Sequence, residues 1–153
     1  MDIVQPYIDN LNNLSDHLEQ EAVNIVSRNK AFIIEYLKDM QLSKGINSLG
    51  QEVGSYKKST QDYWAKLNPP RKRKVAGQIY NFEWTGEFFD SLILNQQKDS
   101  YSILSSNGKD LFLKETFGGI SLTKLTPENN EYINNTIILP NLYKYVLNNL
   151  FKI

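Results

Sequence analysis

The spacing of apolar residues changes twice along this chain of 153 residues, and these changes constrain its fold more than any other feature. From Leu18 to Met40 apolar positions recur every three or four residues, a period that keeps one helix face toward a partner, and only Asn29 interrupts it. From Gly77 the period becomes two, as in a half-buried strand. After Thr126 the helical period returns. This order predicts an α+β fold, with a small antiparallel sheet flanked by long N-terminal and C-terminal helices.

We expect a single domain over residues 1–153, because a chain of this length buries about 70% of its unfolded surface and forms its own core. Its expected parts are an N-terminal helical region at 1–43, a loop with a short helix at 44–76, a sheet at 77–117 and C-terminal helices at 126–153. The N-terminal region fits two helices or one kinked helix, with Ser15 or Asp16 as the cap of the longer one.

Turn and cap signals divide the second half of the chain. Lys98–Asp99 lies between two apolar runs as the expected hairpin turn, and Asn107–Gly108 marks a second turn. Thr126 before Pro127 predicts the start of a helix, with the threonine as its cap. Pro140 is then expected to break or kink the C-terminal helical region.

Several classes of chemistry find no support in the sequence. The chain has no cysteine, which excludes disulfides, thiolate metal sites and a cysteine nucleophile. No motif offers a catalytic partner to the single histidine, His17, so we expect it to be a surface or capping residue. Glu87 and Asp90 would be the carboxylates of a small hydrolase, but they are more simply first-turn residues that complement a helix dipole. We therefore expect that the chain is not an enzyme and that it binds no metal and no cofactor.

Membrane and export signals are also lacking in the sequence. The first residues have neither a basic region nor an apolar run of signal-peptide length, and no stretch approaches the roughly 20 apolar residues that span a bilayer. We expect a soluble chain that folds in the cytoplasm where it is made, with no membrane partner.

Charge is balanced overall and uneven locally. Lys plus Arg and Asp plus Glu number 17 each, but residues 57–74 carry seven cations against Asp62 alone. The run Arg71, Lys72, Arg73 and Lys74 is predicted to be exposed, because four adjacent charges are not buried together. Three interpretations stay open for it: a solvated loop, a contact with an acidic protein, or a contact with the nucleic-acid backbone.

A Thr-Gly step followed by two phenylalanines stands at the end of the strand-like run. We expect Thr85 to cap a short helix, Gly86 to let the chain turn, and Phe88 and Phe89 to face the sheet, so that the stretch with Trp84 forms a scaffold corner. Aromatic residues in such a stretch either belong to the core or stack on bases, and the core interpretation is favoured. The residues expected to serve the fold or a contact are Tyr56, Trp64, Trp84, Phe88, Phe89 and Phe117.

Two stretches together resemble the phage tail-completion and virion-morphogenesis proteins. The first is a long N-terminal helix followed by a glycine loop at 45–50, then Tyr56, Thr60 and Lys66 and a basic linker. The second is the run at 80–92, YNFEWTGEFFDSL, which has the order apolar strand, Thr-Gly, bulky residue and Ser-aliphatic. Members in Bacteroidetes prophages have a further tail of Gly, Leu-Thr, Glu-Asn and a proline-containing helix, matched here by Gly119, Leu125–Thr126, Glu128–Asn129 and Pro140.

The resemblance spans roughly residues 41 to 150 and has one departure. Many members carry Tyr-Ala, then His or Glu, then Gly after the second strand, where this chain has Lys114 to Gly118. The resemblance implies a structural subunit of a tailed-phage virion, made in the host cytoplasm and placed at the head-tail junction or upper tail. It implies a ring of copies that also contacts neighbouring connector and tail proteins. The alternative is a nucleic-acid-binding module that uses residues 71–74, and transient DNA contact is compatible with either.

Overall fold

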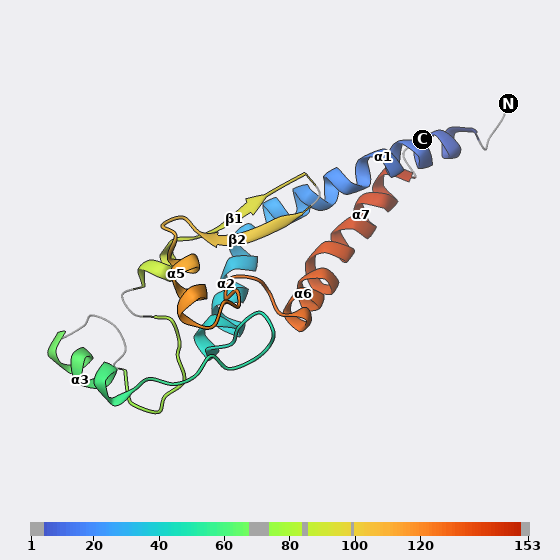
Figure 1. Cartoon of the computed structure of the whole chain (residues 1–153). Coiled ribbons are helices and arrows are strands. Elements are labelled where there is room, and N and C mark those ends of the chain that lie inside the picture. The colour runs from blue at the N-terminus through green and yellow to red at the C-terminus, as the bar shows by residue number, and fades with distance from the viewer. Residues whose placement is uncertain (1–4, 68–73, 84–85, 99, 151–153) are drawn as a thin grey trace.

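The structure is a computed structural model that describes residues 5–67, 74–83, 86–98 and 100–150 (Figure 1). Its elements in chain order are α1 (Gln5–Arg28), α2 (Lys30–Met40), the short 3-10 helix η1 (Leu42–Lys44), α3 (Lys58–Leu67), α4 (Glu87–Asp90), β1 (Leu92–Gln96), β2 (Tyr101–Ser105), α5 (Lys109–Thr116), α6 (Pro127–Ile133), the π-helical turn η2 (Asn134–Ile138) and α7 (Leu139–Leu150). This is an α+β fold with a two-stranded antiparallel sheet, as the apolar spacing predicts.

The N-terminal region is two helices, joined at Asn29. α1 continues through Ser15 and Asp16, so the predicted cap at those residues is wrong. At Asn29 the side-chain Nδ2 donates to the Ile25 carbonyl at 2.7 Å, and the backbone N–H is shared between the Ile25 and Val26 carbonyls at 3.1 Å each. A short amide side chain that bonds to the preceding turn competes with the helical ladder, which explains why the break falls at Asn29.

The sheet is smaller than the predicted region 77–117. β1 and β2 pair in register from Leu92 with Ser105 to Gln96 with Tyr101, so the predicted turn at Lys98–Asp99 falls within the connection between the strands. Asp99 itself lies outside the described residues. Among its described residues, the strand-like run at 77–83 contributes a single bridge, Ser55 with Ile79. The segment at 109–116 is the helix α5, so the prediction that it belongs to the sheet region is wrong.

The C-terminal helices begin as predicted and continue past Pro140. Thr126 caps α6, its side chain accepting from the Asn129 N–H at 3.2 Å, and Pro127 occupies the first turn. Of the predicted break or kink at Pro140, the break does not occur, since α7 continues through Pro140 to Leu150. The irregular part of the helix lies just before it, in the π-helical turn η2. A proline has no N–H to donate into the helix, and a wider turn accommodates it without ending the helix.

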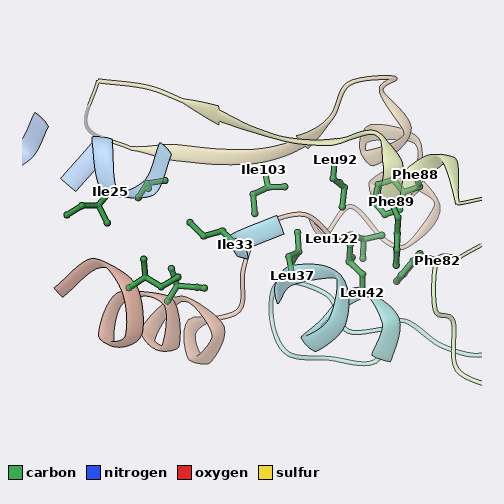
Figure 2. Packing of buried hydrophobic residues seen from close by; sticks show 13 residues of the cluster. Ile25, Ile33, Leu37, Leu42, Phe82, Phe88, Phe89, Leu92, Ile103 and Leu122 are labelled. Atoms are coloured by element: carbon green, nitrogen blue, oxygen red, sulfur yellow. The ribbon is translucent and has the colours of Figure 1, made fainter. Parts of the chain in front are cut away.

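The core lies between the end of α1, α2, the sheet, the C-terminal helices, α4 with the segment before it, and the loop that follows α5. Its buried cluster consists of Ile25, Val26, Ile33, Leu37, Leu42, Phe82, Phe88, Phe89, Leu92, Ile103, Leu122, Ile133 and Ile137 (Figure 2). Ile33 and Leu37 are fully buried under the sheet. α1 and α7 run side by side away from this core, whereas α3 lies at the opposite end of the molecule (Figure 1). Within the described residues, no helix combines the length and apolar character needed to cross a bilayer.

Candidate functional site

The glycine loop at 45–50 meets the strand-like run because Gly45 has no side chain. Its φ is 66°, and a Cβ at this position would lie 2.2 Å from the Tyr80 carbonyl oxygen and 2.5 Å from Ile79 Cγ2. Only glycine combines a left-handed backbone with so close an approach. The Gly45 carbonyl accepts from the Val53 N–H at 2.9 Å, which returns the chain toward Tyr56.

Backbone hydrogen bonds then connect residues 54–56 to residues 77–80. Tyr56 N–H donates to the Gln78 carbonyl at 2.9 Å, Gly77 N–H donates to the Tyr56 carbonyl at 2.9 Å, and Tyr80 N–H donates to the Gly54 carbonyl at 3.1 Å. The two stretches that carry the family resemblance are therefore neighbours in space, although the bonded residues lie 21 to 26 positions apart in the chain.

Lys74 corrects the prediction of an exposed basic run. Its side chain is fully buried, and its Nζ donates to Asn81 Oδ1. The same Nζ lies 5.2 Å from the centre of the Tyr56 ring and 5.9 Å from that of Trp64. Aromatic faces attract a cation and a side-chain amide oxygen satisfies it, so this environment accommodates a buried lysine. The other cations, Arg71, Lys72 and Arg73, lie outside the described residues.

Asn81 is the centre of a small polar network that the sequence analysis missed. Its Oδ1 accepts from the Tyr56 hydroxyl at 2.9 Å and from the Glu83 N–H at 3.3 Å, besides the Lys74 ammonium. Burial raises the pKa of Tyr56 from its ordinary value, so its hydroxyl stays a neutral donor. Gln61 attaches α3 to the same region by accepting from the Ala76 N–H at 2.8 Å.

The scaffold corner differs from its prediction at one residue. α4 has Gly86 at its N-cap, with φ 86°, so the predicted cap at Thr85 is one residue too early. Trp84 and Thr85 lie outside the described residues. Phe88 and Phe89 are both buried in the core cluster, and Ser91 ends α4 by donating its hydroxyl to the Phe88 carbonyl at 2.8 Å.

Aromatic rings continue from this corner to the surface as a connected row. The ring centres of Tyr56 and Tyr80 are 4.6 Å apart, Tyr80 and Phe117 are 5.0 Å apart, and Phe117 and Phe82 are 5.4 Å apart, all in edge-to-face contact. Phe82 has a φ of 53°, a conformation that costs about 1 kcal/mol for a bulky residue. It is held there because its ring also packs on Phe88, at 6.4 Å.

A groove of about 410 Å³ opens beside this row, and we call it the aromatic groove. It is lined by Tyr56, Thr60, Tyr80, Phe82, Glu87, Phe88, Lys109, Phe112, Leu113, Thr116 and Phe117. The Phe112 side chain is 66% exposed at its rim. A groove of this size with mostly aromatic and aliphatic walls has the character of a binding site, and Phe112 and Leu113 are members that the sequence analysis did not single out.

The polar groups of the aromatic groove form an ion pair at its edge. Lys109 Nζ donates to Glu87 Oε2, with the two side chains 38% and 65% exposed. An exposed pair of this kind contributes at most about 1 kcal/mol to stability, and it places one charge of each sign at the rim. Asp90, the other predicted carboxylate, is exposed on α4, and His17 is exposed on α1.

The arrangement offers apolar contact area and hydrogen-bonded support for it. Across residues 5–67, 74–83, 86–98 and 100–150, no three His, Cys, Asp or Glu side chains are grouped so as to hold a metal ion. Comparisons with protein-family models, with curated proteins and with solved structures find no match to this chain. The resemblance to the phage tail-completion proteins therefore remains a hypothesis based on its motifs.

Proposed function

We propose that this chain is a structural subunit of a tailed-phage virion, at the head-tail junction or upper tail, and that it acts through ring-like assembly. The observation that carries the proposal is the convergence of the motif residues. Gly45 lies against the Tyr80 backbone and the Tyr56 hydroxyl donates to Asn81, although these residues come from separate parts of the sequence. Tyr56, Tyr80, Phe82 and Phe88 then line one side of the aromatic groove. Motifs that build a shared scaffold beside an apolar groove favour a binding role.

The chemistry of the groove supports protein contact as its use. Rigid aromatic side chains supply large apolar area with little loss of conformational entropy, and they are enriched at interface centres. Phe112 is 66% exposed beside other apolar residues of the groove, and contiguous exposed apolar surface is typical of protein contact sites. A neighbouring virion protein or another copy of the chain would cover it.

The nucleic-acid alternative loses one of its four cations. Lys74 is enclosed by Tyr56, Trp64 and Asn81, so its ammonium does not face a phosphate. A polyanion contact would then depend on Arg71, Lys72 and Arg73 within a chain of zero formal net charge. A steep loss of retention on a heparin column between 50 and about 200 mM salt would favour this alternative.

Mass measurement of the purified chain, alone and with the products of adjacent virion genes, tests the assembly role. We expect discrete oligomers or rings once the neighbours are present. A chain that stays monomeric with every neighbouring virion protein contradicts the proposal. Retention on heparin serves as the parallel control, since assembly predicts elution at low salt.

A further inference from the structure

A second groove runs along the free edge of β2, on the side of the sheet toward α6 (Figure 1). Residues 100–103 line it in an unbroken run, and Ser121, Thr123, Lys124 and Leu125 line it from the segment before α6. Successive side chains of a strand point to opposite faces, so a cavity lined by four residues in a row lies along the edge of the strand. Its volume is about 790 Å³, and we call it the β2-edge groove.

The backbone along this edge presents hydrogen-bonding groups to the β2-edge groove. Gln97 N–H donates to the Ser100 carbonyl at 2.8 Å, and bonded pairs alternate with non-bonded pairs along two antiparallel strands. In the register of the hairpin, Ser102 therefore bonds to β1, whereas Tyr101 and Ile103 turn their N–H and C=O groups toward the groove. Within the part of the chain that the structure describes, these outward groups have no backbone hydrogen bond. The edge is thus open to a further strand.

The segment that faces β2 across the groove is held in place by the core. Gln41 Nε2 donates to the Leu122 and Lys124 carbonyls at 3.0 and 2.9 Å, and Ser48 N–H donates to the Ser121 carbonyl at 3.0 Å. Gln41 and Leu122 are both buried. These bonds occupy three carbonyls of the segment and fix its position, so the groove is formed before any partner arrives, which lowers the cost of binding.

We propose that the β2-edge groove binds an extended segment of a partner protein, which adds beside β2 as a third strand. A sheet edge accepts such a segment through the same backbone hydrogen bonds that hold the sheet together. Residues 100–103 span about 13 Å, so 790 Å³ over that length gives a mean cross-section of roughly 60 Å², close to the roughly 50 Å² of one strand in a sheet. The groove therefore has room for one strand, and the two-stranded sheet of a second copy is too wide for it.

The charge of the lining indicates which segments fit. Lys124 is exposed and is the only charged side chain that lines the β2-edge groove. Glu128 and Glu131 of α6 do not line it, and no salt bridge among the described residues includes Lys124. Most of the other lining side chains carry a hydroxyl or an amide. A mostly uncharged segment with one acidic residue would pair with the ammonium, and the pair would fix the direction of the added strand.

A random library of peptides of about eight residues, selected on the purified chain, supplies the probe. We expect the selected peptides to be rich in β-branched residues and to contain an aspartate or glutamate. Each peptide is then resynthesised with single N-methyl groups, and fluorescence anisotropy measures its Kd. Loss of one backbone N–H that bonds to β2 is expected to weaken binding about fivefold, at every second position and not at those between. Selection of no peptide overturns the proposal, as does an N-methyl scan without this period of two.

Three variants place the binding in the β2-edge groove. Asn130→Trp fills the groove from α6 and is expected to abolish binding, whereas the matched Asn135→Trp changes an exposed asparagine that does not line it and is expected to bind as the wild type does. Phe112→Glu, in the aromatic groove, is also expected to leave binding unchanged. All three residues are exposed, so the variants are expected to keep the fold, which circular dichroism verifies. Equal binding by Asn130→Trp and Asn135→Trp overturns the proposal.

Reversal of the one charge tests the choice of segment. Lys124→Glu changes an exposed side chain, and repeated selection on this variant is expected to enrich lysine and arginine in place of aspartate and glutamate. An unchanged preference for acidic peptides contradicts the role of Lys124 in that choice.

The inference goes beyond the proposed function and does not depend on it, because a strand from any partner would meet the same edge. If peptides bind with a period of two and no virion protein assembles with the chain, the groove stands and the proposed function is refuted. If rings form with virion proteins and no peptide binds, the strand addition is refuted and the proposed function stands on its own test.

Discussion

Replacement of Gln41 by methionine is expected to destabilise the fold by about 4 kcal/mol. Gln41 is fully buried at the end of α2. Its Nε2 donates to the Leu122 and Lys124 carbonyls at 3.0 and 2.9 Å, and its Oε1 accepts from the Thr126 N–H at 3.0 Å and the Asn129 side chain at 3.3 Å. One side chain therefore connects α2 to the loop before α6 and to the start of that helix.

The magnitude follows from the groups that lose a partner. Methionine fills nearly the same volume, but it leaves two carbonyls and one N–H unsatisfied, at about 1 to 3 kcal/mol for each buried group. Burial of the apolar side chain offsets about 1 to 2 kcal/mol of that cost. A net loss of about 4 kcal/mol is a large part of the 5 to 15 kcal/mol typical of a folded domain. It corresponds to a fall in Tm of roughly 8 to 16 °C for a chain of this length.

Urea unfolding followed by circular dichroism measures this loss directly. Gln20→Met is the matched control, because Gln20 is exposed on α1 and its replacement is expected to change stability by less than about 0.5 kcal/mol. Gln41→Glu tests the donor role separately, since its carboxylate would face two carbonyl oxygens and is expected to be at least as destabilising as methionine. A Gln41→Met variant within 1 kcal/mol of the wild type would refute the argument that this buried network stabilises the fold.

Three further predictions concern single side chains. Gly45→Ala is expected to cost at least about 3 kcal/mol in urea unfolding, because a Cβ would overlap the Tyr80 backbone, whereas Gly50→Ala, with open space around it, is expected to cost about 1 kcal/mol; equal losses would contradict the close approach. Acetylation, measured by mass spectrometry, is expected to modify Lys74 at least about tenfold more slowly than Lys58, whose side chain is 70% exposed. The reagent reaches the buried Lys74 ammonium only when the structure opens locally, and the open state is a small fraction of the folded population. Burial raises the pKa of Tyr101 above 10.0, so its contribution to stability is complete below pH 10 and is lost as pH rises through the raised value; Tyr101→Phe should remove that loss.

The elements that sequence reasoning identified are those that local signals control. Thr126 before Pro127 specifies a helix start through the cap and the missing proline N–H, and both act within one turn of the chain. The β1–β2 hairpin is likewise a contact between neighbours in sequence. Asn29 interrupts the apolar stripe at the residue where the helix ends, although the sequence alone left a single kinked helix equally open.

The errors arise where a distant part of the chain supplies the partner. Alternation at 77–83 indicates an extended backbone, but Gly77 and Phe82 have positive φ angles of 82° and 53°. The segment makes a single bridge, between Ile79 and Ser55. The apolar residues of 109–116 favour the sheet region in the sequence, yet Gly108 starts a helix there and the sheet ends at Ser105. A period of two describes the shape of a segment and leaves its pairing open.

Lys74 shows how far a residue's neighbours in sequence differ from its neighbours in space. Three cations precede it, and a run of four is normally solvated, so charge alone predicts exposure. Its burial depends on Tyr56 and Trp64 from earlier segments and on Asn81 from a later one. Those partners lie 18, 10 and 7 residues away in the sequence, and the glycine at position 45 lets the later segment approach. The basic run therefore ends inside the scaffold that supports the aromatic groove, so at least one of its charges belongs to the folded interior and not to an exposed surface.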